Sequence, residues 1–472
     1  MIVGGGVSGL SAARQLMHDG QQDFVLLELE QNTGGNASYG KNEVSAYPLG
    51  AHYIPIPNNE LKEYLDFLQE CDVIIDYDKQ GLPVYNELFL CHDPEERLYL
   101  NGAWQDGLVP RYGVSDAERE EFVKFFSLMD HFRALKGEDG KDVFAIPVDT
   151  SARSETARAL DQITMKEWME QENLHGNHLR WYVDYCTRDD FGTRYDQISA
   201  WAGIHYFAAR KGKGANAAYH DVLTWEEGNG FLVRQLQKKS ADQIRSNALV
   251  VSIEYSGDDV RVQYLDTQTG KIGGIRAGHC IIAAPQFVAA RLLKEENRSM
   301  LVRQHLHYVP WMVANLTVND MLSERSGSPA SWDNVIYGGK GLGYVDATHQ
   351  QLQQHKGKRN LTYYYPLTDA DPLTERKAAQ KRTYEEWVAH VISDLKLVHP
   401  NIEQATERMD ISLWGHAMAQ PLPGWIHGSE RQELGKSLHG RIHFAHTDLA
   451  GISIFEEAFY QGVHAARKAA SS

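Results

Sequence analysis

Cysteine is scarce in this chain of 472 residues, which contains only four. Cys71, Cys91, Cys186 and Cys280 lie far apart in the sequence and form no Cys-x-x-Cys pair. Such spacing suggests neither a zinc cage nor a disulfide scaffold. We therefore expect four buried thiols and no metal site.

Long apolar runs are also missing. No stretch reaches the roughly 18 apolar residues that a transmembrane helix needs, and no export signal precedes Met1. The chain as written is therefore expected to be cytoplasmic. Only Met1-Ile2-Val3 precedes the first glycine turn, whereas strands usually have about 5–6 residues. A longer natural N-terminus, with a periplasmic location, stays open.

Positive charge is in deficit. Lys and Arg number 47 against 63 Asp and Glu, which gives a formal net charge of −16. This balance argues against nucleic acid or an anionic membrane as a partner. It is compatible with a cationic small-molecule substrate, and equally with a plain solvated surface. It gives no indication of the oligomeric state.

Several catalytic signatures are absent as well. The sequence contains no His-Glu-x-x-His, no Gly-x-x-x-x-Gly-Lys-Ser/Thr and no Gly-x-Ser-x-Gly. The chain therefore lacks the motifs that zinc proteases, P-loop NTPases and α/β-hydrolases require. A hydrophobic fraction of 42% and a length beyond that of one core indicate a folded enzyme of two or three lobes.

What the chain does contain is a glycine-rich opening. The segment Gly4-Gly5-Gly6-Val7-Ser8-Gly9 fits G-x-G-x-x-G between a strand and a helix, where a pyrophosphate approaches the backbone and the helix N-terminus. Glu28 follows 24 residues after Gly4, beside Leu29, at the end of a predicted second strand over 24–29. An acidic side chain at that position binds ribose hydroxyls. The opening predicts a βαβ dinucleotide site.

Later segments alternate between helix and strand patterns. Helices are predicted over 59–70, 116–135, 231–239, 374–397 and 454–470, and the aromatic-rich segment 179–211 is predicted to be mostly helical. Strands are predicted over 248–255, 260–265, 278–284, 311–318, 360–365 and 441–445. A loop rich in Pro and Gly is predicted from residue 411 onward.

The doublet Gly34-Gly35, soon after Glu28, resembles the flavin amine oxidase superfamily, which includes monoamine and polyamine oxidases, protoporphyrinogen oxidase and phytoene desaturase. The resemblance implies an FAD site in which Glu28 binds ribose and the doublet lets the backbone pass close to the cofactor. Asn36 stands where many members have Arg. Gly50, Ala51 and His52 follow the early strand that should end near the flavin ring.

The C-terminal third extends the resemblance. Asp448 matches an acidic position near the phosphates and ribityl chain, although His446 replaces the usual glycine. Ile454 falls where monoamine oxidases place a Tyr of their aromatic pair, and the final helix would stabilise negative charge on the reduced ring. Between these ends, Val251 resembles the strand beside adenine and Ala284 the strand end beside the cofactor.

The resemblance also implies an α/β fold with a Rossmann-like, doubly wound FAD-binding domain of the GR2 type and an interleaved α+β substrate domain. We expect the FAD-binding domain to comprise residues 1–57, 215–300 and 405–472, and the substrate domain 58–214 and 301–404. The segment 414–424, expected to face the flavin, contains no cysteine. A cysteinyl-flavin bond is therefore not expected, and FAD would be bound non-covalently.

His416 and His52 are the candidate catalytic residues, because their segments should lie near the flavin. Two further nominations are the charged turn 188–192 and the helix face of Trp201, His205 and Tyr206. A buried structural histidine, a solvated turn and core aromatics are the competing interpretations.

The predicted reaction is hydride transfer from an organic substrate, an amine foremost, to flavin N5, with reoxidation by oxygen or another acceptor. The alternatives are a C–C desaturase or porphyrinogen-type oxidase, a redox-neutral flavin isomerase or mutase, and a non-catalytic dinucleotide-binding protein. An NAD(P)-dependent dehydrogenase explains Gly4 to Glu28 but neither Gly34-Gly35 nor the C-terminal segment.

Overall fold

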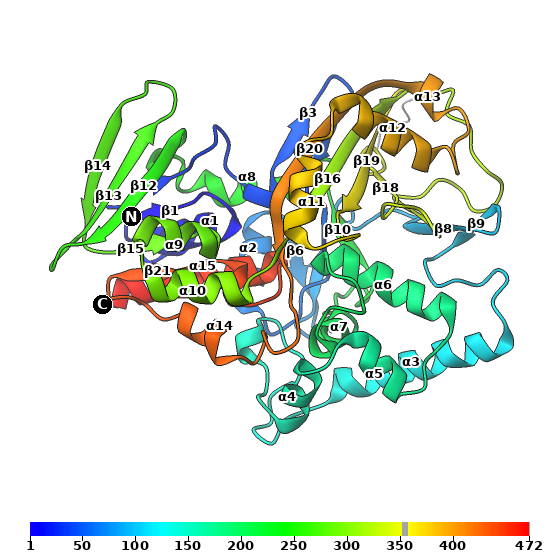
Figure 1. Cartoon of the computed structure of the whole chain (residues 1–472), viewed down its shortest axis with the longest axis horizontal. Coiled ribbons are helices and arrows are strands. Elements are labelled where there is room, and N and C mark those ends of the chain that lie inside the picture. Colours follow the sequence, from blue (N-terminus) through cyan, green and yellow to red (C-terminus); the bar gives the residue numbers. More distant parts are fainter. Residues whose placement is uncertain (352–356, 472) are drawn as a thin grey trace.

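Two β-sheets of different kinds organise the molecule (Figure 1). The computed structural model describes residues 1–351 and 357–471. The first sheet has five parallel strands, in the order β11 (Ile244–Arg245), β2 (Leu26–Leu27), β1 (Ile2–Val3), β15 (Cys280–Ile282) and β21 (Ile442–Phe444). The predicted βαβ opening is present, although its two strands are short.

Helices pack around this parallel sheet. The helix α1 (Val7–His18) lies against β1 and against α15 (Phe455–Ser471), which in turn contacts β15 and β21. Leu10, Ala12, Ala13 and Leu16 form the buried face of α1. The other helices of this region are α8 (Gly230–Lys238), α9 (Gln286–Leu293), α10 (Glu296–His305) and α14 (Ser429–Leu434).

An antiparallel sheet of three strands projects beside the parallel sheet, at the left of Figure 1. Its strands are β12 (Ala248–Tyr255), β13 (Val260–Asp266) and β14 (Ile272–Ala277). The first two match the predicted strands at 248–255 and 260–265. The third was not predicted, because its two central glycines and its alternation of half-buried and exposed residues give little apolar signal.

The second large sheet has seven strands and reaches across the other half of the molecule. Its order is β20 (Thr406–Ala419), β16 (Tyr308–Val318), β19 (Arg359–Pro366), β18 (Tyr344–Asp346), β17 (Asp333–Ile336), β8 (Glu96–Leu100) and β9 (Ala103–Asp106). Every residue of β16 is buried. The apolar strands predicted at 311–318 and 360–365 thus form the middle of this sheet.

The strand β20 corrects the prediction of a loop from residue 411 onward. Residues 406–419 pair antiparallel with β16 along nearly their whole length. Most of β20 is only half buried, so its sequence lacks a clear apolar pattern, and the pairing partner lies about 100 residues earlier. The pairing also joins 406–419 to the seven-stranded sheet, so the predicted domain boundary at residue 405 cuts off one of its strands.

The single helix predicted at 374–397 is two helices, α11 (Pro372–Ala379) and α12 (Tyr384–Leu395). Thr383 starts the second one with a capping box, in which its side chain and that of Glu386 bond each other's backbone N–H groups. The short α13 (Ile402–Ala405) follows. The capping box at Thr383 therefore divides the apolar pattern of residues 374–397 into two helices.

A group of helices lies below the seven-stranded sheet in Figure 1. It contains α3 (Asp116–Ala134), α4 (Glu155–Asp161), α5 (Met165–Gln171), α6 (Asn177–Phe191) and α7 (Ala200–Ala208), while α2 (Lys62–Glu70) lies nearer the parallel sheet. The predicted charged turn at 188–192 is the last turn of α6, which ends at Gly192 in a left-handed conformation.

Short hairpins and strand pairs complete the chain. They are β3 (Tyr39–Lys41) with β4 (Ala46–Pro48), β5 (Tyr53–Pro55) with β10 (Val222–Thr224), and β6 (Ile74–Tyr77) with β7 (Pro83–Tyr85). All four cysteines are buried free thiols, as predicted. Within the described residues, no helix combines the length and apolar character needed to cross a bilayer.

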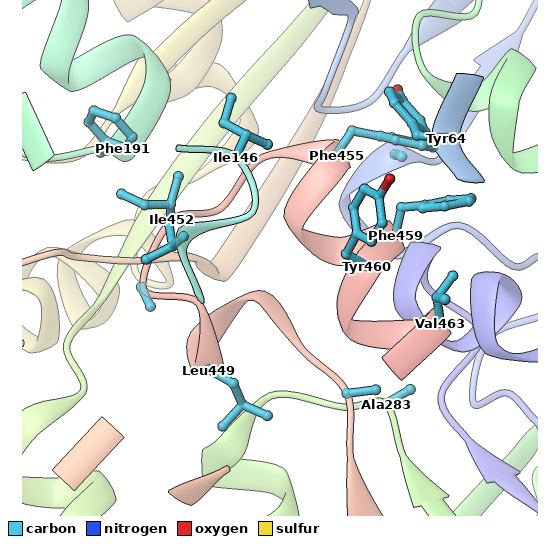
Figure 2. Close-up of a cluster of buried hydrophobic side chains, with 14 of the residues drawn as sticks. Tyr64, Ile146, Phe191, Ala283, Leu449, Ile452, Phe455, Phe459, Tyr460 and Val463 are labelled. Carbon is cyan, nitrogen blue, oxygen red and sulfur yellow. The ribbon is translucent and has the colours of Figure 1, made fainter. Parts of the chain in front are cut away.

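The C-terminal helix anchors a continuous apolar core. Figure 2 shows Phe455 and Phe459 of α15 beside Tyr64 of α2, and the ring centroid of Tyr64 lies 5.2 Å from that of Phe459 and 6.0 Å from that of Phe455. Phe67 stacks on Phe459 at 5.6 Å. These aromatic contacts join α15, which packs on the parallel sheet, to α2.

The crossing of α15 over α1 yields a stability prediction. A Cβ on Gly462 would lie 2.1 Å from the Ser8 carbonyl oxygen and 2.9 Å from the Ala12 backbone nitrogen. We expect Gly462→Ala to lower the free energy of unfolding by about 1–3 kcal/mol, measured by chemical denaturation. Gly274→Ala in β14 is the control, because its nearest neighbour would be 3.9 Å away. Equal losses in both variants would contradict this account.

Candidate functional site

A cavity of about 360 Å³ opens at the carboxyl ends of the parallel strands. We call it the glycine-loop cavity, because Gly4, Gly5 and Gly6 form part of its wall. Further lining residues come from the ends of β2, β15 and β21, and from β12, β20 and the start of α15. Ligands of parallel α/β sheets bind at this edge.

The glycine loop has the geometry of a phosphate cradle. Gly4 has a φ of +101°, and a Cβ on Gly9 would lie 1.9 Å from the Gly4 carbonyl oxygen, so the loop closes tightly against α1. A Cβ on Gly6 would meet nothing within 4 Å, because this residue borders open space. No side chain caps the start of α1. The N–H groups of its first turn are therefore available to an anion.

Glu28 closes the end of β2 beside this loop. Its Oε2 accepts a hydrogen bond from the Gly5 N–H at 2.6 Å and its Oε1 accepts one from the Glu30 N–H at 2.8 Å. Burial raises the pKa of Glu28, and the two backbone donors partly offset the effect. The carboxylate thus lines the glycine-loop cavity beside the loop.

Asp448 joins three distant segments and is only 1% exposed. Its Oδ2 accepts hydrogen bonds from the Tyr308 hydroxyl at 2.6 Å and the Gln286 N–H at 2.8 Å. The His446 Nδ1 lies 2.9 Å from its Oδ1. Burial alone would raise the pKa of Asp448, but these three groups stabilise the carboxylate and bring the pKa below its ordinary value.

His416 lies on β20 and lines the glycine-loop cavity, with its ring stacked on Phe287 at 4.3 Å. Burial, followed by the charges of Arg376 and Arg291, lowers its pKa to about 4. The ring is therefore neutral near pH 7. The strand β20 thus places this candidate residue in the wall of the glycine-loop cavity.

A second cavity, of about 150 Å³, adjoins the first. Both are lined by Asn36, Ala51, Ala417, Ser453, Ile454 and Phe455. We call the second one the aromatic cavity, because Tyr53, Trp311, Tyr364 and Trp414 line it. The amide of Asn36 donates a hydrogen bond to the Ala417 carbonyl and so ties the Gly34-Gly35 turn to β20.

His52 belongs to the wall of the aromatic cavity, together with Gly50. Its ring stacks on Tyr364 at 4.6 Å and lies 5.6 Å from Trp332. Burial lowers its pKa to about 4, so this imidazole is also neutral near pH 7. The two histidines thus lie in different cavities.

Most, but not all, of the predicted cofactor-binding residues line the glycine-loop cavity. Those in the wall of the glycine-loop cavity are Gly4, Gly5, Gly6, Val7, Ser8, Glu28, Leu29, Gly34, Gly35, Asn36, Ala51, Ala284, Asp448 and Ile454. Gly9 supports the loop from behind, as its steric contacts show. Val251 is not in this wall: it is 43% exposed, whereas Ala248, Leu249 and Val250 line the cavity instead.

The remaining nominations divide between core and cavity. Trp201 and His205 are buried in the core, where the His205 Nε2 lies 3.0 Å from the Ala145 carbonyl oxygen. Asp189 and Asp190, at the end of α6, line the aromatic cavity. Trp201 and His205 are therefore core residues, as the competing interpretation expected. Asp189 and Asp190 line a cavity and are not part of a solvated turn.

Several wall residues were missed from the sequence. Tyr308 on β16 and Tyr364 on β19 reach the two cavities from the seven-stranded sheet, and Arg210 and Glu456 reach the aromatic cavity from elsewhere. In the sequence, each of these residues is only an aromatic or charged residue among apolar neighbours. Such a pattern does not show whether the side chain faces a cavity or the core. Long-range pairing decides which of them faces a cavity.

The chain belongs to the flavin containing amine oxidoreductase family, whose model matches residues 7–470. This match confirms the predicted resemblance to the flavin amine oxidases.

Among its relatives, an amine oxidase [flavin-containing] of Oncorhynchus mykiss is 22% identical over 318 residues. That match covers 66% of this chain and 54% of the relative, so the chain spans about half the length of the curated amine oxidases that it matches.

Solved structures share the fold. Wild-type putrescine oxidase bound to putrescine aligns with a TM-score of 0.73 at 15% identity, covering 100% of this chain and 98% of that one. A fatty acid isomerase that produces CLA, from P. acnes, aligns with a TM-score of 0.67 at 13% identity, covering 98% and 96%. The chain therefore has the mixed α/β fold of flavin amine oxidase structures.

The steric contrast between two loop glycines predicts separate effects. Gly6→Ala should change the free energy of unfolding of the apoprotein by no more than about 0.5 kcal/mol, because its methyl group enters open space. It should weaken FAD binding at least about tenfold, since that space would receive the pyrophosphate. Gly9→Ala, with its backbone clash, should destabilise the fold itself. Fluorescence titration and denaturation measure both effects, and normal FAD affinity in Gly6→Ala would refute the cradle.

Tyr308→Phe tests the Asp448 cluster through pH. The folded-state pKa of Asp448 lies below its unfolded value, so its stabilisation is present above about pH 4 and is lost as pH falls through the folded pKa. We expect the variant to be less stable by about 1.5–3 kcal/mol at neutral pH, with a difference that shrinks below about pH 4.

The control for that experiment is Tyr384→Phe, whose hydroxyl donates to the neutral Met409 carbonyl at 2.8 Å. The loss in free energy of unfolding caused by Tyr384→Phe should be the same at neutral pH and below about pH 4. Urea denaturation at a series of pH values measures both variants, and a pH-independent cost for Tyr308→Phe would show that Asp448 does not contribute as a carboxylate.

Proposed function

We propose that this protein binds FAD non-covalently and oxidises a small amine. The parallel sheet and its helices would form a Rossmann-like FAD-binding domain, built from the segments around 1–57, 215–300 and 420–472. The seven-stranded sheet and the helices α3 to α7 would form the substrate domain. The continuity of the glycine-loop cavity with the aromatic cavity is the observation that supports this proposal most directly.

The residues present fit an FAD molecule in an extended pose. The loop at Gly6 and the uncapped start of α1 suit a pyrophosphate, and Glu28 suits a ribose. Among the residues described as lining the glycine-loop cavity there is no cysteine, which agrees with the absence of a cysteinyl link. Bound FAD would supply the acceptor for a hydride equivalent.

The aromatic cavity suits a neutral amine. Desolvation disfavours a charged ammonium group, and the rings of Tyr364, Trp311 and Trp414 exclude water from the space next to the junction with the glycine-loop cavity. His52 is neutral there, so it adds no positive charge beside the substrate and can form a hydrogen bond with it. These residues orient the donor carbon, which is their contribution to the rate.

His416 lies on the cofactor side of the junction and has a different role in this proposal. Its neutral ring, stacked on Phe287, would contact the cofactor rather than the substrate. Asn36 and Ile454 lie at the junction itself and would separate the two ligands.

Other flavin reactions fit the aromatic cavity less well. A fatty acid isomerase shares it, but the aromatic cavity contains the carboxyl groups of Asp189, Asp190 and Glu456 against the single guanidinium of Arg210. This charge balance disfavours a carboxylate substrate and attracts an ammonium ion from solvent. Desaturation of an uncharged substrate is the alternative that the experiment below must separate.

The proposal is tested on purified protein in two steps. Acid release followed by chromatography should yield FAD, and release of NAD(P), or of no cofactor, would overturn it. Under anaerobic conditions, a panel of primary amines, polyenes and fatty acids is then mixed with the holoprotein. We expect amines to bleach the flavin absorbance and the other donors to leave it unchanged. Bleaching by polyenes alone would instead establish a desaturase.

A further inference from the structure

His446 borders the glycine-loop cavity at the edge of the parallel sheet. It follows the end of β21 by two residues, it lines that cavity, and its side chain is 25% exposed. The family pattern has glycine at this position, so the imidazole is an addition to the cavity wall in this chain. A ligand in the cavity therefore meets a polar ring where glycine would offer only backbone.

One side of the His446 ring is held by Asp448. The Asp448 N–H donates a hydrogen bond to Nδ1 at 3.2 Å, and the Asp448 Oδ1 lies 2.9 Å from the same atom. Asp448 is itself fixed by the Tyr308 hydroxyl and the Gln286 N–H. The ring therefore has a defined position before any ligand binds, and a ligand contact costs it little conformational freedom.

The other ring nitrogen of His446, Nε2, is available to a ligand. Within residues 1–351 and 357–471, no residue forms a hydrogen bond with Nε2. An imidazole nitrogen donates a hydrogen bond when it carries a proton and accepts one when it does not. A hydroxyl group can do both, so a ligand hydroxyl can bond to Nε2 in either state.

The strand order indicates which part of FAD lies beside His446. Neighbouring strands lie about 4.8 Å apart, and the order at the cavity is β2, β1, β15, β21. Glu28 at the end of β2 suits the ribose, and the glycine loop after β1 suits the pyrophosphate. His446 follows β21, two strands beyond β1, which is about 10 Å farther along the edge and away from Glu28. The group that follows the pyrophosphate in this direction is the ribityl chain, which is rich in hydroxyl groups.

Charged side chains are not available to hold a ligand at this end of the cavity. The described wall residues include no Lys or Arg, and the Asp448 carboxylate is bonded to Tyr308 and Gln286. Neutral hydrogen bonds must therefore orient a ligand near β21. The other polar wall residues that follow β21 are His446, Thr447 and Ser453, and among these His446 has the longest side chain.

We propose that His446 binds a hydroxyl group of the FAD ribityl chain through Nε2 and so positions the flavin ring at the junction with the aromatic cavity. This inference rests on the proposed FAD binding and not on the amine oxidation. His446 touches the cofactor chain and not the reacting atoms. Through Asp448 and Tyr308, the contact connects the cofactor to β16 of the seven-stranded sheet.

Two substitutions separate this contact from a structural role. The amide of His446→Gln can occupy the place of Nε2, whereas the amide of His446→Asn can occupy only the place of Nδ1, next to Asp448. We expect His446→Asn to weaken FAD binding about three- to tenfold and His446→Gln to stay within about twofold of the wild type. A role confined to holding Asp448 predicts the opposite order. Fluorescence titration of the apoproteins with FAD measures these affinities.

ADP is the matched control ligand, because it contains the adenosine and the pyrophosphate but no ribityl chain. Its affinity, measured by competition with FAD, should be unchanged in His446→Asn, whereas Gly6→Ala should weaken ADP and FAD alike. FAD analogues that each lack one ribityl hydroxyl identify the contact atom. One of them should bind the wild type about three- to tenfold more weakly than FAD, with no such difference in His446→Asn.

The position of the flavin ring has its own measurement, the visible circular dichroism of the bound flavin. We expect this spectrum to change in His446→Asn and to return towards that of the wild type in His446→Gln. An unchanged spectrum in His446→Asn would show that the ring is positioned without His446.

His18→Asn is the matched control variant, because the exposed His18 ends α1 at the far end from the cavity. It should leave the FAD and ADP affinities unchanged. Equal FAD affinity in the wild type and both His446 variants, or equal losses of ADP and FAD affinity in His446→Asn, would overturn the ribityl contact while leaving FAD binding intact. A larger loss in His446→Gln than in His446→Asn would also overturn it. No FAD binding by the wild type would overturn both proposals.

Discussion

The close approach of backbone to backbone around the glycine loop is the constraint on which the rest of the structure depends. A Cβ added to Gly4 would lie 2.5 Å from the Ala283 carbonyl oxygen. A Cβ added to Gly462 would lie 2.1 Å from the Ser8 carbonyl oxygen. β15, the loop, α1 and α15 are therefore packed at distances that only glycine permits. This packing fixes the N-terminus of α1 at the cavity and brings Ile454, just before α15, to the junction.

Much of this arrangement could be predicted because it is encoded locally. The loop Gly4 to Gly9, the strand end at Glu28 and the doublet Gly34-Gly35 lie within about 30 residues, and spacing alone relates them. Asp448 was assigned from the family resemblance of the segment 441–448, in which an acidic residue follows a late strand. Its hydrogen bond from Tyr308 could not be foreseen, because β16 is buried along its whole length and its pattern does not show which side chain meets the C-terminal segment.

The substrate side was much less predictable. β20 is stabilised by pairing with β16 rather than by its own alternation, and the helix break at Thr383 depends on a capping box within an apolar pattern. Asp189 was nominated from its charge, but its neighbours Asp333 and Glu96 come from strands more than 90 residues away on either side. The cavities are products of tertiary structure, and local sequence contains no record of them.

The strand order of the parallel sheet has a consequence for how the protein folds during its synthesis. β1 at Ile2–Val3 pairs with β15 at Cys280–Ile282, which in turn pairs with β21 at Ile442–Phe444. During synthesis β1 is thus made about 280 residues before β15, which is one of its two neighbours in the sheet. Contacts of such long sequence separation form slowly and leave apolar edges exposed in the meantime. The nascent chain is therefore an expected client of chaperones until α15 covers the sheet.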